Sequence, residues 1–158
     1  MKIARWLYRG GRPNRIARVV NRATAAVFAL GVAPNYLVAL YVVGRRSGQV
    51  RSLPVVMALV DGERYFVSML GAEVEWVRNV RAAGGRVTLR HGRREEVRLE
   101  EIAADRRAPV LKAYLQRAPG ARPHLPIDKD APLSEIARVA ARFPVFRVVS
   151  RSAGPEAL

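Results

Sequence analysis

The chain has 158 residues, 50% of them hydrophobic and 26% charged, a composition typical of a globular rather than a disordered protein. Lysine and arginine number 28 against 13 acidic residues, and the net charge of +15 favours phosphate, carboxylate-rich ligands, nucleic acid or an acidic membrane as partners. The chain has no cysteine, which excludes disulfides, thiolate metal sites and a cysteine nucleophile, and with two histidines no metal-binding residue is predicted.

The first 60 residues contain no acidic residue, and six arginines from Arg5 to Arg22 recur every three or four positions. This spacing places them on one helix face. The opposite face carries an apolar stripe of Ile16, Val19, Val20, Ala23 and Val27. Gly10, Gly11 and Pro13 predict a short first helix and a longer second one. Such a helix either packs on the domain with its arginines solvated, the favoured interpretation, or lies on an anionic membrane.

An uncharged stretch from Ala23 to Gly44 has the length of a membrane span, but Pro34 and Asn35 interrupt it. Its second half has the pattern of a strand, so no transmembrane helix is expected. No secretory cleavage site is evident. The predicted location is the cytoplasm, with peripheral contact at the inner membrane face as the alternative.

From residue 37 onward, short apolar runs alternate with turn signals, which predicts an antiparallel sheet with attached helices. The expected strands are residues 37–43, 52–60, 64–70, 86–90, 95–102 and 145–149. The expected helices are residues 73–83, 105–117 and 133–142. Asp105 is a predicted N-cap, and Asp61-Gly62 is the strongest hairpin signal. This pattern predicts a mainly β, α+β protein built as a small closed or partly open barrel.

We find no repeat and no linker, so one domain is predicted for residues 1–158. Within it, residues 1–34 form a basic helical extension, residues 35–150 the barrel and residues 151–158 a tail.

The best candidate binding site is the loop of residues 44–51, which reads GRRSGQVR. Its two glycines permit a tight turn on which backbone N–H groups can converge on an anion. Side-chain donors suited to phosphate or carboxylate come from Arg45, Arg46, Ser47 and Arg51. The same pattern fits a solvated basic turn equally well, and the spacing is not that of a P-loop.

A second candidate is the pair Trp76 and Asn79, which are three residues apart and share a helix face. An indole can bound the plane of a flat heterocycle while a carboxamide bonds its edge. A core tryptophan beside a capping or solvent-facing asparagine is the favoured alternative on spacing alone.

These motifs together resemble the deazaflavin-dependent nitroreductase family. The likeness rests on YVVGRRSGQVRSLPV at residues 41–55, the Asp61-Gly62 hairpin and WVRN at residues 76–79, and it extends over roughly residues 35–103. Residues 144–148 supply a plausible terminal strand. The resemblance implies a split β-barrel of five to seven strands that binds coenzyme F420, a deazaflavin with a phosphate and a polyglutamate tail.

The resemblance also implies a set of cofactor-binding residues. Those for the phosphate and tail are Arg45, Arg46, Ser47, Gly48 and Arg51. Those beside the deazaflavin ring are Pro54, Val55, Val56, Ser68, Met69, Leu70, Gly71, Trp76 and Asn79. The implied reaction transfers a hydride from reduced F420 to an electron-poor acceptor, and no catalytic side chain is identified.

Three departures from the family shape this prediction. Arg46 stands where the nitroreductase prototype has lysine, residues 72–75 lack the His-Pro of many relatives and place two acids near the anion site, and the tyrosine-rich C-terminal pocket is not recognisable. We therefore expect a quinone rather than a nitro compound as acceptor.

Other classes stay open. The same barrel family includes proteins that bind FMN, haem or lipid without this activity, and FMN is the second choice of cofactor. Charge alone would also suit a nucleic-acid or membrane adaptor, although the aromatic residues are not interleaved with arginines as stacking platforms need. A homodimer is a further prediction.

Overall fold

The computed structural model describes residues 15–31, 34–118 and 126–151, with side chains from residue 18 onward. The strands are β1 (Leu37–Val43), β2 (Val50–Val56), β3 (Ala58–Val60), β4 (Glu63–Val67), β5 (Arg86–His91), β6 (Arg93–Glu101) and β7 (Val145–Ser150). The helices are α2 (Arg15–Ala29), α3 (Glu75–Ala82), α4 (Ala108–Arg117) and α5 (Leu133–Val139), with 3-10 turns η2 (Ala104–Arg106) and η4 (Ala140–Arg142). The short first helix expected near the N-terminus lies outside the described residues.

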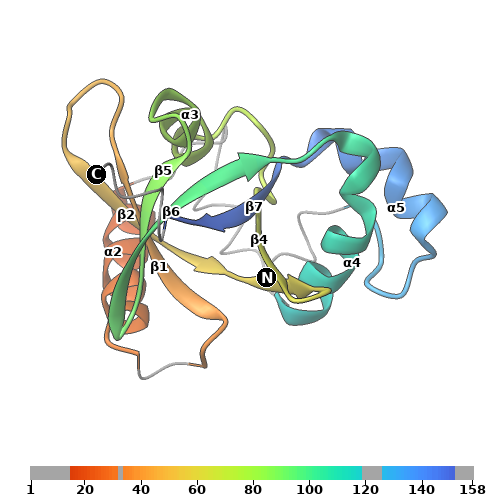
Figure 1. Cartoon of the computed structure of the whole chain (residues 1–158), viewed down its shortest axis with the longest axis horizontal. Coiled ribbons are helices and arrows are strands. Elements are labelled where there is room, and N and C mark those ends of the chain that lie inside the picture. Colours follow the sequence, from red (N-terminus) through yellow and green to blue (C-terminus); the bar gives the residue numbers. More distant parts are fainter. Residues whose placement is uncertain (1–14, 32–33, 119–125, 152–158) are drawn as a thin grey trace, which may run out of the picture.

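The seven strands form one antiparallel sheet in the order β2-β1-β5-β6-β7-β4-β3 (Figure 1). Its two outermost strands, β2 and β3, are consecutive in the chain and separated only by Met57. The sheet must therefore curl until its edges approach each other, and β2 also contacts β4. This is the split barrel of the α+β class, and that prediction is confirmed.

The single strand expected over residues 52–60 is wrong, because the chain changes partner at Met57. β2 pairs with β1, whereas β3 pairs with β4 at the other edge of the sheet. The Met57 N–H donates to the Tyr36 carbonyl at 2.7 Å, which fixes the crossing point. Pro54 has no N–H and lies in the edge strand β2, where a proline is tolerated.

Asp105 does not cap a helix, so that prediction is also wrong. It lies in η2, and α4 begins only at Ala108 with a proline in its first turn. A proline fits the first turn because its missing N–H would be unsatisfied there. The Asp61-Gly62 hairpin is confirmed, since both residues have positive φ angles, 50° and 77°.

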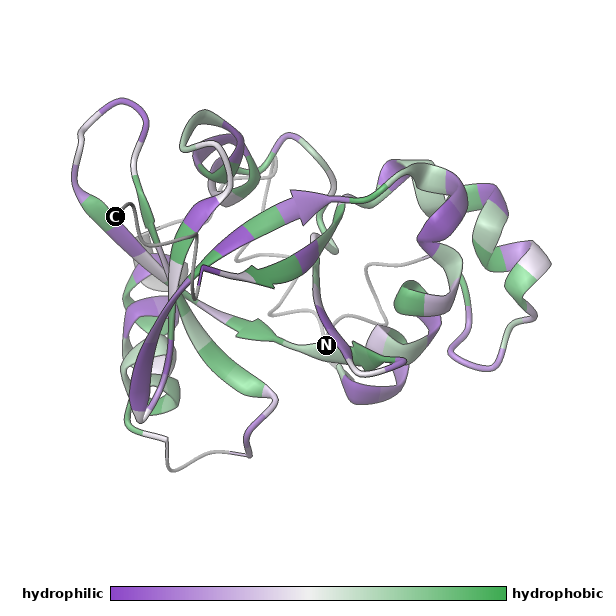
Figure 2. Ribbon diagram, in the orientation of Figure 1, coloured by the Kyte–Doolittle hydropathy of each residue, from purple (hydrophilic) through white to green (hydrophobic). Residues whose placement is uncertain are grey.

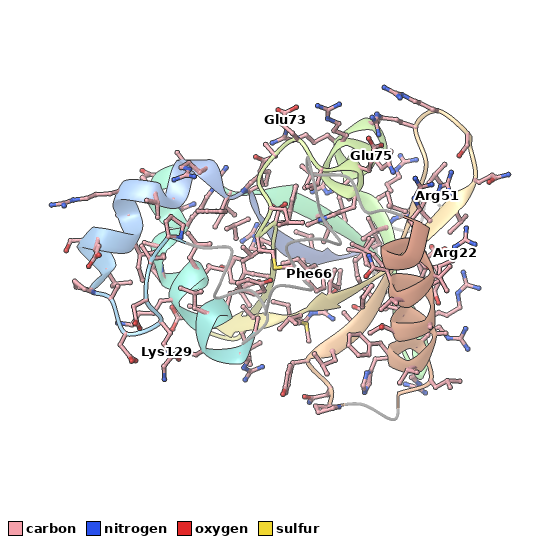
Figure 3. All side chains as sticks on the ribbon, turned by 180° about the vertical axis from the view of Figure 1, so that it is seen from behind. Arg22, Arg51, Phe66, Glu73, Glu75 and Lys129 are labelled. Carbon is pink, nitrogen blue, oxygen red and sulfur yellow. The ribbon has the colours of Figure 1, made fainter. Side chains whose placement is uncertain are left out.

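Two large apolar clusters fill most of the described part of the molecule, and a smaller third one lies between α2 and β1. The first lies inside the barrel, under α3, and contains Phe66 and Phe146, which are buried at 0% and 2% exposure. The second joins α4 and α5 to β3, β4 and β7 around Leu111 and Ile136. Figure 3 shows Phe66 in the interior. Figure 2 shows hydrophilic residues on the β1–β2 loop and the β5–β6 hairpin, as well as on the outer faces of the helices.

Helix α2 packs on β1 and β2 by a different face from the one expected. Ala25 and Ala29 are buried against Ala39, whereas the described side chains of the stripe predicted to pack on the domain are exposed. They are Val19 (67%), Val20 (49%), Ala23 and Val27 (47%); Leu30 (67%), directly after the helix, is exposed as well. Small alanines let the helix approach the sheet closely, and the Gly92 N–H donates to the Ala29 carbonyl at 2.8 Å. No helix in the described ranges is long and apolar enough to cross a membrane.

Candidate functional site

The loop between β1 and β2 is a compact, internally bonded turn. The Gly44 N–H donates to the Gln49 carbonyl at 2.8 Å, and the Gly48 N–H donates to the Gly44 carbonyl at 2.9 Å. The Ser47 Oγ accepts from the Gln49 N–H at 3.2 Å. A Cβ on Gly44 would meet that hydroxyl at 2.8 Å and the Gln49 carbonyl oxygen at 3.2 Å, so a larger residue here would have to displace the Ser47 side chain.

Helix α3 holds the loop through Arg45 and Asn79. The Asn79 Oδ1 accepts from the Arg45 backbone N–H at 3.1 Å and from its Nη1 at 2.9 Å. The same Nη1 donates to the Glu75 Oε2 at 2.7 Å. Asn79 is only 6% exposed, and the Arg45 side chain is 18% exposed. The base of the loop is thus fixed to a helix rather than left free in solvent.

The remaining side-chain donors are exposed to solvent: Arg46 and Ser47 on the loop, and Arg51 at the start of β2. Gly48 is exposed as well, but its N–H is already bonded to the Gly44 carbonyl. Figure 3 shows Arg51 and Glu75 at one end of the molecule and Lys129 at the other. Within the described part of the chain neither Arg46 nor Arg51 forms an ion pair, so both guanidinium groups are available to an anionic ligand.

Glu73, just before α3, and Glu75, its first residue, repel an anion less than their position in the sequence predicted. Glu75 pairs with Arg45, and Glu73 pairs with Arg78. Each carboxylate therefore has a guanidinium partner, which reduces its repulsion of an anionic ligand at the loop.

The residues predicted to lie beside the ring come from β2 and from the turn after β4. Pro54, Val55 and Val56 are partly buried in β2. Ser68 is 1% exposed, and its hydroxyl donates to the Gly71 carbonyl. Gly71 has a φ of +94°, and Met69 and Leu70 are partly buried between it and Ser68. The turn is thus internally fixed, as a surface flanking a flat ligand needs to be.

Trp76 packs toward the barrel rather than toward the loop. Its ring centroid lies 5.7 Å from that of Phe146, with the planes tilted by 55°. The indole is partly buried against the barrel cluster. The spacing of Trp76 and Asn79 does bring both to the inner side of α3, but the carboxamide bonds the loop while the indole joins the core.

Two cavities lie away from these residues. One, of about 400 Å³, follows β4 and β7 and includes Gly62, Arg64 and Arg147. The other, of about 170 Å³, includes Met57, Arg64, His91 and Glu95. Neither contains a residue predicted to bind cofactor.

A bidentate ion pair stands beside the smaller cavity. Arg64 donates to both carboxylate oxygens of Glu95, at 2.7 and 2.8 Å. These hydrogen bonds lower the pKa of Glu95 below its ordinary value of 4.5. The pair joins β4 to β6 across the rim of the barrel and has no part in the candidate site.

The F420H(2)-dependent quinone reductase family matches residues 15–125. This chain belongs to that family. The match takes in the β1–β2 loop and α3, and it confirms the resemblance that the motifs carried. Members of the F420H(2)-dependent quinone reductase family are enzymes. They are F420-dependent oxidoreductases that act on a small-molecule acceptor. No curated protein sequence matches the chain.

Solved structures share the fold of this quinone reductase family member. A conserved hypothetical protein, Rv2991 from Mycobacterium tuberculosis, is 19% identical, with a TM-score of 0.54 over 80% of this chain and 79% of that one. A chain described as a domain-swapped dimer is 19% identical, with a TM-score of 0.53 over 85% and 93%. The protein Atu2129 from Agrobacterium tumefaciens str. C58, of unknown function, is 16% identical, with a TM-score of 0.54 over 88% and 56%. At these identities they support the fold alone.

Glu75 is the residue of this site that sequence reasoning did not assign. It lies four positions before Asn79, so the two share a helix face. That spacing was a usable signal, but the partner, Arg45, is 30 residues away in the chain, and only the fold brings it near.

Proposed function

We propose that this protein is an F420H2-dependent quinone reductase whose β1–β2 loop binds the anionic part of the cofactor. The observation that carries this is the exposed pair Arg46, on a loop whose base is fixed by Asn79, and Arg51, which follows that loop at the start of β2. Guanidinium groups and a hydroxyl suit phosphate and carboxylate oxygens. The donor set therefore fits a phosphate with a polyglutamate tail, and family membership supports the same cofactor.

The ring is proposed to lie against β2 and the turn after β4. Pro54, Val55 and Val56 would bound one side, and the fixed turn from Ser68 through Met69 and Leu70 to Gly71 the other. Trp76 and Asn79 would close the inner side. These side chains would orient the cofactor and shield its reactive face from water, which is the protein's share in hydride chemistry.

When bound, the reduced deazaflavin supplies a hydride, which together with one proton converts a quinone to a quinol. The chain itself needs no metal, cysteine or covalent intermediate for this step. An electron-poor quinone remains the proposed acceptor.

A second proposal concerns α2, which we expect to lie on an anionic membrane. Val19, Val20, Val27 and Leu30 form an exposed apolar face on a helix from the acid-free part of a +15 chain. Apolar side chains that insert at the headgroup boundary, with arginines beside them, are typical of interfacial helices. This would bring the enzyme to membrane quinones and locate it at the inner membrane face, in the cytoplasm.

The organisation of the chain stays a prediction. We expect residues 1–158 to form one domain. We also expect the protein to form homodimers, and one structural neighbour, described as a domain-swapped dimer, supports the dimer. Sedimentation of the protein measures its oligomeric state directly, and a monomer over the whole concentration range would contradict the dimer.

Turnover tests the function. Full-length protein is mixed with reduced F420 and a soluble short-chain quinone, and both are followed optically. We expect one cofactor oxidised for each quinone consumed, at a rate above that of the same mixture without protein, and no acceleration by the protein when reduced FMN replaces F420. Acceleration with reduced FMN alone would favour the flavin alternative, and acceleration with neither would favour a haem or lipid carrier or an adaptor.

A further inference from the structure

We infer that Arg45, Glu75 and Asn79 are positioning residues for the anion-binding loop, and that Arg45 is not itself a ligand of the cofactor. This inference rests on the proposed function of the loop. It changes the role that the family resemblance gives to Arg45, and it assigns a role to Glu75, which the resemblance does not include.

The hydrogen bonds of Arg45 are directed into the protein. Its Nη1 carries two hydrogens, and the acceptors Glu75 Oε2 at 2.7 Å and Asn79 Oδ1 at 2.9 Å account for both. Its backbone N–H also donates to Asn79, at 3.1 Å. With 18% of its side chain exposed, Arg45 presents little surface to a ligand in solvent.

The charge of Arg45 is also neutralised. Glu75 lies within salt-bridge distance, so the pair presents almost no net charge to an approaching anion. Arg46, the next residue, is exposed and has no such partner in the described ranges. Two adjacent arginines therefore have different roles: Arg45 holds the loop, and Arg46 binds.

Fixing the loop matters for affinity. A flexible loop loses conformational freedom when it closes on a ligand, and a loop already held in its bound form avoids that loss. Asn79 is buried on a helix, so the loop is anchored to a rigid element. Loosening this anchor should weaken anion binding without removing any group that touches the anion.

If Arg45 instead binds the cofactor directly, replacement of Glu75 should change the affinity for the anion in the opposite direction. If Arg45 were a cofactor ligand, Glu75 would compete with the anion for its guanidinium, and removal of the carboxylate would tighten binding. Glu73 supplies the matched control, because it starts the same segment, carries the same charge and pairs with Arg78 instead.

The test measures dissociation constants of the full-length protein for F420 and, separately, for inorganic pyrophosphate. We expect Glu75→Gln to raise the dissociation constant about tenfold relative to Glu73→Gln, the size of one lost charge-assisted hydrogen bond. Binding by Glu75→Gln as tight as, or tighter than, that of Glu73→Gln overturns the inference.

A second readout is the salt dependence of binding. The double variant Arg45→Gln/Glu75→Gln leaves the net charge unchanged and should weaken binding while keeping the wild-type slope of affinity against salt. Arg46→Ala should lower that slope, because it removes a cation that contacts the anion. If the salt slope falls equally in the double variant and in Arg46→Ala, the inference is overturned.

The two claims fail in different ways. Wild-type protein that binds pyrophosphate but not F420 contradicts the proposed function, and the variants then still test the positioning role with pyrophosphate. Wild-type protein that binds neither contradicts both.

Discussion

Arg107 and Arg46 show two uses of the same side chain in two regions of the molecule. Arg107, at the start of α4, is buried, with 9% of its side chain exposed. It donates to the carbonyls of Ile102 at 3.0 Å and Phe143 at 3.2 Å, and to the Glu101 carboxylate at 3.2 Å. Arg46, on the β1–β2 loop, is exposed to solvent.

The difference shows that a high arginine content has no single meaning. Arg107 joins the end of β6 to the segment before β7, so its charge serves the fold. The exposed arginines of the loop gain nothing from the fold, since exposed charges contribute little to stability. They are the part of the +15 charge that is available for binding.

Replacement of Arg107 should have the largest effect. Arg107→Ala leaves buried carbonyls without a donor, and we expect the free energy of unfolding to fall by about 3–5 kcal/mol. Denaturant unfolding measures this. Arg106→Ala, at an exposed neighbouring position, is the control, and equal losses in the two variants would contradict a bracing role for Arg107.

Replacement of Arg46 on the loop, or of Arg51 at the start of β2, should leave stability nearly unchanged and weaken binding. For Arg46→Ala or Arg51→Ala we expect the dissociation constant for F420 to rise tenfold to about a hundredfold, because each removes a charged hydrogen bond. The free energy of unfolding should change by less than about 0.5 kcal/mol. Arg138→Ala, an exposed arginine on α5, removes the same charge elsewhere, and equal weakening by it would show that net charge alone drives binding.

The exposed apolar residues of α2 should contribute to membrane binding, as the exposed arginines should contribute to anion binding. Val19→Ser/Leu30→Ser should weaken binding to phosphatidylglycerol vesicles by about tenfold, because both side chains are 67% exposed and free to insert. Co-sedimentation measures the bound fraction. Leu133→Ser, at 46% exposure on α5, should bind as wild type, and a loss there equal to that of the α2 variant would contradict a specific role for α2.

Acid should produce the smallest effect. The pKa of Glu95 is lowered by its hydrogen bonds to Arg64, so the pair stabilises the fold above pH 4.5 and loses its contribution as the pH falls through the lowered pKa. The Glu95 side chain is 42% exposed, and solvent screening limits the contribution to at most about 1 kcal/mol. Wild type should exceed Glu95→Gln in stability at neutral pH, and the difference should shrink below pH 4.5 and vanish once the pH is below the lowered pKa of Glu95. A constant difference at every pH would contradict this.

Local patterns predicted much of the fold, because they act over a few residues. The apolar run of β1 and the Asp61-Gly62 turn were confirmed at their positions. The change of partner at Met57 could not be read from the sequence, since residues on both sides are apolar and fit one continuous strand. The outward apolar face of α2 was missed because its alanines, rather than its larger residues, meet the sheet.

The candidate site, like the fold, could be predicted from the sequence only in part. The loop donors follow from residue type and spacing, whereas the pairing of Arg45 with Glu75 depends on the position of α3 beside the loop. The burial of Arg107 likewise depends on Phe143, which lies 36 residues away in the chain. Contacts of this kind come from topology, which no local pattern encodes.

The most direct test of the central claim is a titration of the full-length protein with F420, run in parallel with FMN at the same salt concentration. We predict saturable binding of F420 at micromolar or lower dissociation constant, and no saturable binding of FMN. Saturable binding of FMN alone, or of neither, would contradict the claim that the β1–β2 loop is the anion site of an F420-dependent enzyme.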